Sequence, residues 1–135
     1  MNIIENNIDH IIEYIIKNKL GFGWKNHPNR TNQGTYLSGE PFDYIIIKDN
    51  QIYCFDCKET GLKHWAIKKK DIQQAINLKK ISLTKHGVIC GFLIYWKEIK
   101  QTTFLEINVF EEIIKERKHV KFEDCKIFDL GVFIK

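Results

Sequence analysis

Two β-rich segments on either side of a short polar stretch constrain the fold of this chain most. The first is Asp-Tyr-Ile-Ile-Ile at residues 43–47, and the second is Gln-Ile-Tyr-Cys-Phe-Asp-Cys-Lys at residues 51–58. β-Branched and aromatic residues favour strands, and the intervening Lys48-Asp49-Asn50 supplies residues that are typical of turns. The pattern therefore predicts an antiparallel hairpin.

This hairpin would bring three charged side chains together. Successive side chains of a strand alternate between its faces, so Asp56 and Lys58 point the same way, and Asp43 lies beside Asp56 on the neighbouring strand. Two carboxylates in a partly buried site repel each other unless a cation joins them, and Mg²⁺ is the default hard cation for oxygen ligands. With a lysine near a water or a scissile phosphate, the set suits metal-assisted phosphodiester hydrolysis. The alternative is a surface hairpin with three solvated charges, because Asp-x-Lys is a short and common motif.

The same residues resemble a known group of nucleases. An aspartate followed across a hairpin by Asp-x-Lys is similar to the motif of the PD-(D/E)XK nuclease superfamily. The segment Cys-Phe-Asp-Cys-Lys-Glu-Thr at residues 54–60 resembles the Glu-Ala-Lys-Glu-Thr segment of RecU-type Holliday junction resolvases. Further segments resemble that family in chain order. Residues 4–15 resemble its first helix, residues 71–78 its glutamine-bearing helix, and residues 87–96 the glycine-led strand that follows. Residues 103–124 resemble its next strand, helix and basic segment.

The resemblance implies a divalent-metal-dependent, structure-specific DNA endonuclease that resolves Holliday junctions by paired phosphodiester hydrolysis. It implies that Asp43, Asp56 and the backbone carbonyl of Cys57 bind Mg²⁺, for which Mn²⁺ can substitute. Lys58 would position the attacking water or stabilise charge on the phosphate. Two alternatives stay open: another nuclease of the same superfamily, of the nicking or repair type, and a non-catalytic DNA-binding module of the same fold.

Two further site residues follow from the resemblance alone. Glu5 matches the carboxylate of the family's first helix better than Glu13 does, and it would support the metal directly or from its outer shell. Gln74 matches the family's glutamine better than Gln73 does, because an apolar residue follows it at once. For each of these residues the alternative is a solvated side chain on an exposed helix face.

Residues 21–40 predict a loop or a short stalk, because glycine, asparagine, proline and serine interrupt any periodicity. Aromatic and cationic side chains alternate there, which suits stacking on bases and contact with phosphates; they are Trp24, Lys25, Arg30 and Tyr36. The resembled resolvases carry at this position a stalk that enters the junction. The alternative is an ordinary loop with one tryptophan anchored in the core.

A run of three lysines adds a second candidate DNA contact. Lys68, Lys69 and Lys70 could follow the phosphates beside a nuclease site, although such a run is more often a solvated face. A net charge of +4 is compatible with a branched or duplex DNA partner. Because opposing strands must be cut in pairs, we also expect a homodimer with C2 symmetry.

Cysteine usage and hydropathy limit the cellular compartments in which we expect the protein. Cys54 and Cys57 are three residues apart in a strand, which places their sulfur atoms on opposite faces and excludes a redox pair or half a zinc site. Four cysteines without a visible secretion signal indicate free thiols in a reducing compartment. The apolar runs are too short to cross a membrane. We therefore expect a cytoplasmic or nucleoid-associated protein, whether a cell or a phage in its host encodes it.

The periodicity predicts an α/β fold in one domain over residues 1–135. The elements follow the order αβββαββα, to which the apolar C-terminal segment can add a final strand. The resemblance implies that they form a restriction-endonuclease-like mixed central sheet flanked by helices. Expected elements are a helix at 3–19, a helix at 71–85 with Ala75, Ile76, Leu78 and Ile81 inside, a buried strand at 88–96, a strand at 103–107, and a helix at 109–117 that Asn108 and Glu111 cap.

Overall fold

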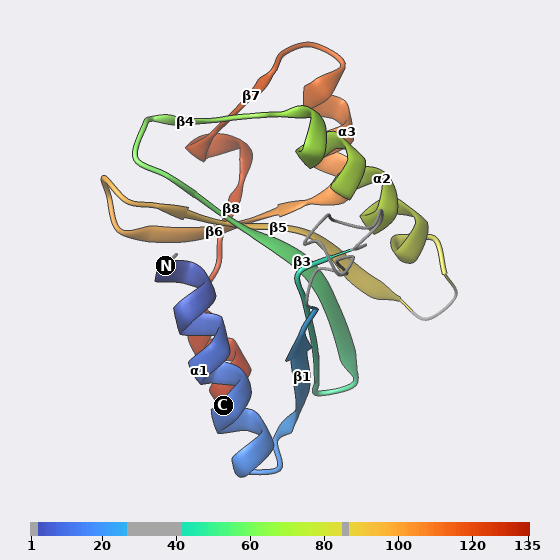
Figure 1. The fold of residues 1–135 in the computed structure, drawn as a ribbon, viewed down its shortest axis with the longest axis vertical. Coiled ribbons are helices and arrows are strands. Elements are labelled where there is room, and N and C mark those ends of the chain that lie inside the picture. Colours follow the sequence, from blue (N-terminus) through green and yellow to red (C-terminus); the bar gives the residue numbers. More distant parts are fainter. Residues whose placement is uncertain (1–2, 27–41, 85–86) are drawn as a thin grey trace, which may run out of the picture.

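The computed structural model describes residues 3–26, 42–84 and 87–135, and Figure 1 shows their arrangement. Within these residues a central sheet has six strands in the order β1-β2-β3-β5-β6-β8, and a separate sheet pairs β4 with β7. The strands are β1 Gly21–Lys25, β2 Tyr44–Lys48, β3 Gln51–Thr60, β4 His64–Ala66, β5 Val88–Trp96, β6 Gln101–Glu106, β7 His119–Lys121 and β8 Lys126–Ile127. The helices are α1 Ile3–Lys17, α2 Lys69–Ser82 and α3 Ile107–Ile114, with 3₁₀ turns at Phe122–Asp124 and Leu130–Ile134.

The central sheet is mixed, as the sequence predicted. Strands β3 and β5 are parallel, and the other neighbouring strands of this sheet are antiparallel. Helix α2 makes the connection between β3 and β5, because two parallel strands need a crossover. Strand β5 lies in the middle of the sheet and is largely buried, in agreement with its almost continuous apolar sequence.

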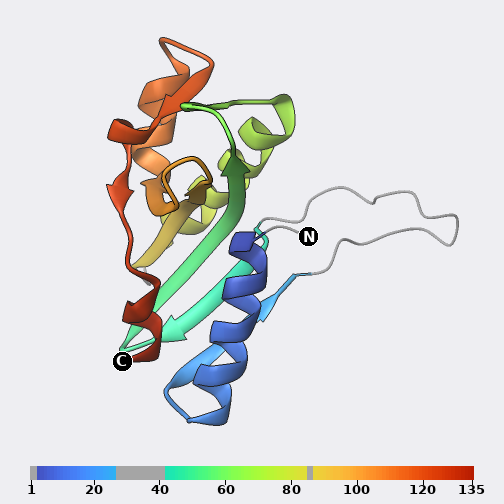
Figure 2. The same cartoon turned by 90° about the vertical axis from the view of Figure 1, so that its left-hand side faces the viewer.

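Helices cover both faces of the central sheet. Figures 1 and 2 show α1, in blue, on one side, with α2 and α3 on the other. Helix α1 buries four isoleucines at helical spacing against β2 and β3; they are Ile4, Ile8, Ile12 and Ile15. On the opposite face Ala75 and Leu78 of α2 pack with Phe92 of β5 and Phe110 of α3. The hairpin formed by β2 and β3 thus lies between two apolar layers that fix its backbone.

The hairpin turn is the one the sequence predicted. Asp49 and Asn50 adopt φ values of 53° and 63°, so the turn has two central residues in the left-handed region. Asp and Asn tolerate this region better than other residues with side chains, and such a turn matches the twist of the flanking strands. The strands then pair with Tyr44 opposite Phe55, which places Asp43 next to Asp56.

Residues 21–25 form strand β1 instead of the beginning of a loop, so this part of the prediction was wrong. A Cβ atom at Gly21 would lie 2.2 Å from the carbonyl oxygen of Ile47, and one at Gly23 would lie 3.1 Å from Ile12. The two glycines therefore allow β1 to approach β2 and α1 closely. The rest of the predicted loop, with Arg30 and Tyr36, falls in residues 27–41, outside the described residues.

The predicted cap of the third helix was also wrong. Helix α3 begins at Ile107 directly after β6, with Glu106 at its N-cap position, because Ile107 is buried in the core and holds the junction there. Asn108 and Glu111 instead contact Lys79 of α2 through a hydrogen bond and an ion pair. These polar contacts join α2 to α3 on their outer side.

Two apolar assignments also need correction. Ile76 was expected inside, but it is 46 % exposed, because the buried stripe of α2 is narrow and runs through Asp71, Ala75 and Leu78. The apolar C-terminal segment forms a 3₁₀ turn at Leu130–Ile134 in place of a strand. Its Phe133 is buried against Tyr53, with 5.1 Å between the ring centroids. A turn can bury this one side chain, so the segment does not need to pair as a strand.

The cysteine prediction is confirmed. Cys54 packs in the core beneath α2, whereas Cys57 packs beneath α1, so the two thiols lie on opposite faces of β3. All four cysteines are free. In the described part of the chain, no helix has the length and apolar character that crossing a membrane requires.

Candidate active site

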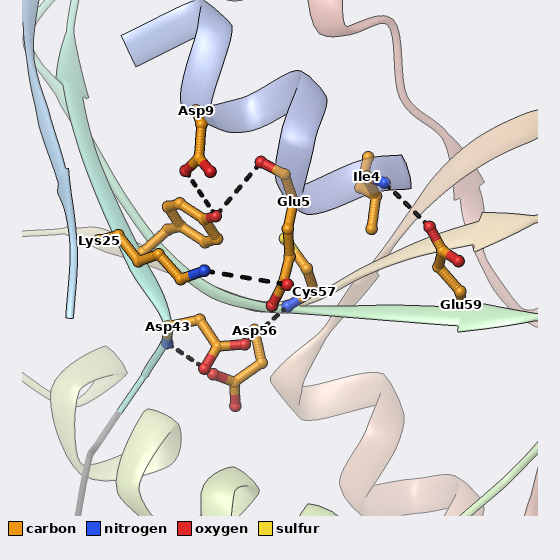
Figure 3. Close-up of polar contacts among 9 residues, drawn as sticks. Ile4, Glu5, Asp9, Lys25, Asp43, Asp56, Cys57 and Glu59 are labelled. Carbon is orange, nitrogen blue, oxygen red and sulfur yellow. Dashed lines mark hydrogen bonds and ion pairs between the residues drawn. The ribbon is translucent and has the colours of Figure 1, made fainter. Parts of the chain in front are cut away.

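The backbone of the hairpin holds Asp43 and Asp56 side by side, as Figure 3 shows. The backbone N–H of Asp43 donates to Oδ1 of Asp56 at 2.6 Å. The backbone N–H of Cys57 donates to Oδ2 of Asp43 at 3.2 Å. Each carboxylate is therefore oriented by the strand that carries the other, which is a consequence of the register between β2 and β3.

Asp56 is fully buried, and its second carboxylate oxygen has no hydrogen-bond partner among the described residues. Oδ2 accepts no hydrogen bond from any described residue. Burial, and next to it the charge of Asp43, raises the pKa of Asp56 to about 8, while Lys58 opposes this shift. Two adjacent carboxylates, one of which has a buried oxygen without a hydrogen-bond partner among the described residues, form an arrangement that suits a bound cation.

The residues present fit Mg²⁺ with waters better than an all-protein metal cage. Within residues 3–26, 42–84 and 87–135, no three His, Cys, Asp or Glu side chains gather into a metal-binding group. Mg²⁺ commonly binds through one or two carboxylates and keeps several waters. Asp43 and Asp56 supply that number of carboxylates, and the half-buried position of Asp43 leaves the site open to solvent on one side.

Glu5 lies near the two aspartates, on the first turn of α1. Burial raises the pKa of Glu5 most, Lys25 opposes the shift, and Asp43 adds to it. Lys25 Nζ lies 3.9 Å from the Glu5 carboxylate and 5.6 Å from the centre of the Tyr44 ring. Glu13 is exposed on the same helix, so the structure brings Glu5 and not Glu13 towards the site. Lys25 lies beside Glu5, and its contact with DNA stays a prediction.

Lys58 is held by α2. Its Nζ lies 2.8 Å from Oδ1 of Asp71 and donates a hydrogen bond to Oε1 of Gln74 at 2.8 Å. Among the described residues, its ion pair is with Asp71 and not with Asp43 or Asp56. Gln73 is exposed, so of the two glutamines only Gln74 reaches the lysine. The expected ammonium beside the carboxylates is thus present, but it is oriented from the helix side.

Sequence reasoning missed two residues that orient this site. Asp71 was read only as the beginning of a helix, yet it is 1 % exposed and pairs with Lys58. Glu59, next to Lys58 in the motif, accepts a hydrogen bond from the backbone N–H of Ile4 at 3.0 Å and pairs with Lys97. Glu59 therefore fixes the first turn of α1, which carries Glu5, onto β3. A carboxylate three residues into a helix was the available signal for Asp71.

The candidate DNA contacts that are described lie on the surface. Trp24 is 42 % exposed on β1 and packs against Phe22 with 5.6 Å between the ring centroids, so it is not a core anchor. Lys68, Lys69 and Lys70 are exposed at the beginning of α2. Arg30 and Tyr36 lie outside the described residues.

Comparisons with known proteins bear on the family and the fold of the chain. The family model of Recombination protein U (RecU) matches residues 4–131. Among solved structures, the chain is similar to the Holliday junction resolvase Hjc of the archaeal hyperthermophile Archaeoglobus fulgidus, with a TM-score of 0.58 and 11 % identity over 90 % of this chain and 92 % of that one. The structural likeness supports the restriction-endonuclease-like fold. A search of curated proteins found no match.

Proposed function

The chain belongs to the RecU family of Holliday junction resolvases, and we propose that Asp43 and Asp56 form the divalent-metal site of this endonuclease. The observation that carries the proposal is the buried Oδ2 of Asp56, which has no hydrogen-bond partner in the described part of the chain and lies beside the Asp43 carboxylate. Without a cation, burial and the charge of Asp43 disfavour the ionised form of Asp56 and raise its pKa. With one, the same arrangement becomes favourable.

We assign different roles in hydrolysis to the residues of the site. Asp43 and Asp56 would hold the cation, together with the carbonyl of Cys57, and Glu5 would support it from α1. A bound divalent cation polarises the scissile phosphate and acidifies a water molecule. Lys58, oriented by Gln74, would place its ammonium against the attacking water or against a phosphate oxygen that gains charge in the transition state.

We assign Mg²⁺ as the natural cation, with Mn²⁺ able to replace it. The donors are hard oxygens from carboxylates and water, and imidazole or thiolate ligands are not gathered in the described residues. Because a four-way junction must be cut on two opposing strands, the working form should be a C2 homodimer with both sites facing the junction.

A cleavage assay on three DNA shapes tests the function. We expect paired nicks in a four-way junction in the presence of Mg²⁺, slower cutting of a flap, and little cutting of plain duplex. Sedimentation of the free protein should show a dimer. Preferred cutting of the flap or duplex by a monomer would instead favour a nicking or repair nuclease of the same superfamily. Binding without any cutting would favour a non-catalytic module.

Replacement of Lys68, Lys69 and Lys70 by glutamine should weaken binding to all DNA shapes alike. Each phosphate contact that is lost should reduce the slope of log K against log salt by about 0.9, because fewer counterions are released. Fluorescence anisotropy at several salt concentrations measures this. Replacement of three exposed lysines elsewhere is the matched control and should leave the slope unchanged; these are Lys17, Lys115 and Lys126. Equal slopes of log K against log salt in both variants would show that the beginning of α2 does not contact DNA.

Replacement of Trp24 by alanine should cost junction affinity more than duplex affinity. Stacking of one base on an aromatic ring contributes about 1–3 kcal/mol, and unstacked bases are found at the junction centre, not in duplex. Competition band shifts with junction and duplex measure the preference. Tyr14, which is exposed on α1, provides the control aromatic and should be replaceable without effect. A loss of the same size for both DNA shapes would contradict a stacking role.

A further inference from the structure

Asp71 stands out because it is a buried acid that belongs neither to the proposed metal ligands nor to the proposed phosphate contacts. It lies in the first turn of α2, and its side chain is 2 % exposed, while the Lys58 side chain that it meets is 12 % exposed. Among the described residues, Oδ1 of Asp71 accepts no hydrogen bond, so the Lys58 ammonium at 2.8 Å balances its charge. A buried carboxylate is costly without such a partner, which makes the pair strongly interdependent.

The other oxygen of Asp71 is fixed by the backbone of its own helix. Oδ2 accepts a hydrogen bond from the N–H of Lys68 at 2.8 Å, which is the cap of α2. The Asp71 carboxylate therefore has one orientation set by the helix, and that orientation decides where Oδ1 meets the ammonium. Lys58 is a long, flexible side chain, and the position of its charge depends on such a partner.

Three kinds of contact surround the ammonium of Lys58. Asp71 attracts it, Gln74 accepts one N–H, and the rings of Trp65 and Phe92 lie 6.0 and 5.9 Å away. An ammonium has three N–H donors, so donors remain for a water or phosphate oxygen beyond these contacts.

We infer, on the basis of the function proposed above, that Asp71 is the positioning residue that holds the Lys58 ammonium at the reacting phosphate. The described polar contacts of Asp71 are with Lys58 and with the backbone of its own helix, so it acts through Lys58. The same residue caps the helix whose first turn carries the exposed Lys69 and Lys70. The catalytic ammonium and the proposed phosphate contacts are thereby fixed to one element.

The test is single-turnover cleavage of a four-way junction by Asp71→Asn and Asp71→Glu. Asparagine keeps an oxygen for the helix cap and loses the charge, so the maximal rate should fall about ten- to hundredfold, as for a misplaced catalytic group. Junction affinity, measured with Ca²⁺ in place of Mg²⁺, should stay within about twofold, since no DNA contact is lost. Glutamate restores the charge and also caps helices well, so it should recover most of the rate.

A double variant separates positioning from folding. In a Lys58→Ala background, adding Asp71→Asn should change the rate no further, and it should improve folding because the unpaired buried carboxylate is removed. Asp124→Asn is the matched control, because Asp124 also combines an ion pair, with Arg117, and a helix-cap bond, from Lys121. This control should cut at the wild-type rate.

The outcomes separate this inference from the function on which it rests. Equal rates for Asp71→Asn and wild type, no rescue by glutamate, or an additional loss in the double variant would each overturn the role of Asp71 while the junction is still cut. If the wild-type protein cuts no junction at all, the proposed function itself fails.

Discussion

Asp56→Asn is expected to abolish junction cleavage and, in the presence of EDTA, to make the folded protein more stable than the wild type. The cleavage loss follows from the missing charge at the proposed metal site, where a cation supplies several kcal/mol of transition-state stabilisation, on the order of a thousandfold in rate or more. The fold is kept because the amide oxygen can still accept the N–H of Asp43.

The gain in stability has a defined pH dependence. The pKa of Asp56 is about 8 in the folded protein, against an ordinary value of 3.8. Between these values the folded state binds a proton that the unfolded state has lost, so wild-type stability falls as pH rises. Asparagine does not titrate, so the variant should exceed the wild type at pH 8 and approach it near pH 4.

Urea unfolding in EDTA at several pH values measures this difference, and Mg²⁺ provides the second readout. Mg²⁺ should raise the melting temperature of the wild type and not that of Asp56→Asn, because a ligand stabilises the state that binds it. Glu112→Gln is the control, since this glutamate is exposed and, within the described residues, its ion pair is with Lys115. Wild-type cleavage by Asp56→Asn, or an equal Mg²⁺ shift in both proteins, would contradict the site.

Lys58→Ala is expected to lower the turnover rate by about a hundredfold while junction affinity changes little. The estimate is the usual effect of removing one donor that stabilises charge in the transition state. Binding should persist because the proposed phosphate contacts are the exposed lysines of α2 and not this largely buried side chain.

The stability of this variant must be followed with its rate. Loss of the ammonium leaves Asp71 buried and unpaired, and such a break costs about 3–5 kcal/mol. Circular dichroism below the melting temperature confirms that the folded fraction is comparable. Lys58→Arg serves as the conservative variant and should retain part of the rate because it keeps the charge. A large loss of junction affinity at a normal turnover rate would instead make Lys58 a phosphate clamp.

The catalytic hairpin could be predicted because it depends on local rules. Alternation along β3 places Asp56 and Lys58 on one face and separates Cys54 from Cys57, and Asp49 with Asn50 determines the turn. These features need only the period of a strand and the conformational preferences of turn residues. The register then follows from the turn.

Predictions failed where a residue makes a tertiary packing contact that cannot be inferred from its neighbours in the sequence. Gly21 and Gly23 suggested a loop, yet they let β1 approach β2 and α1 closely. Asn108 was a good candidate for a helix cap, but burial of Ile107 starts α3 earlier. In both cases the tertiary packing outweighed a local preference worth about 1 kcal/mol or less.

By itself the sequence determined the mixed α/β fold, the strand pair that carries both aspartates, and the membership of the family, because these depend on periodicity and on short motifs. Only the tertiary structure decided what orients the site. Lys58 meets Asp71 and Gln74 across the crossover, Glu59 anchors the first turn of α1, and Lys25 lies beside Glu5. These contacts join residues far apart in the chain, and their energies depend on burial and distance, which no local pattern of residue types contains.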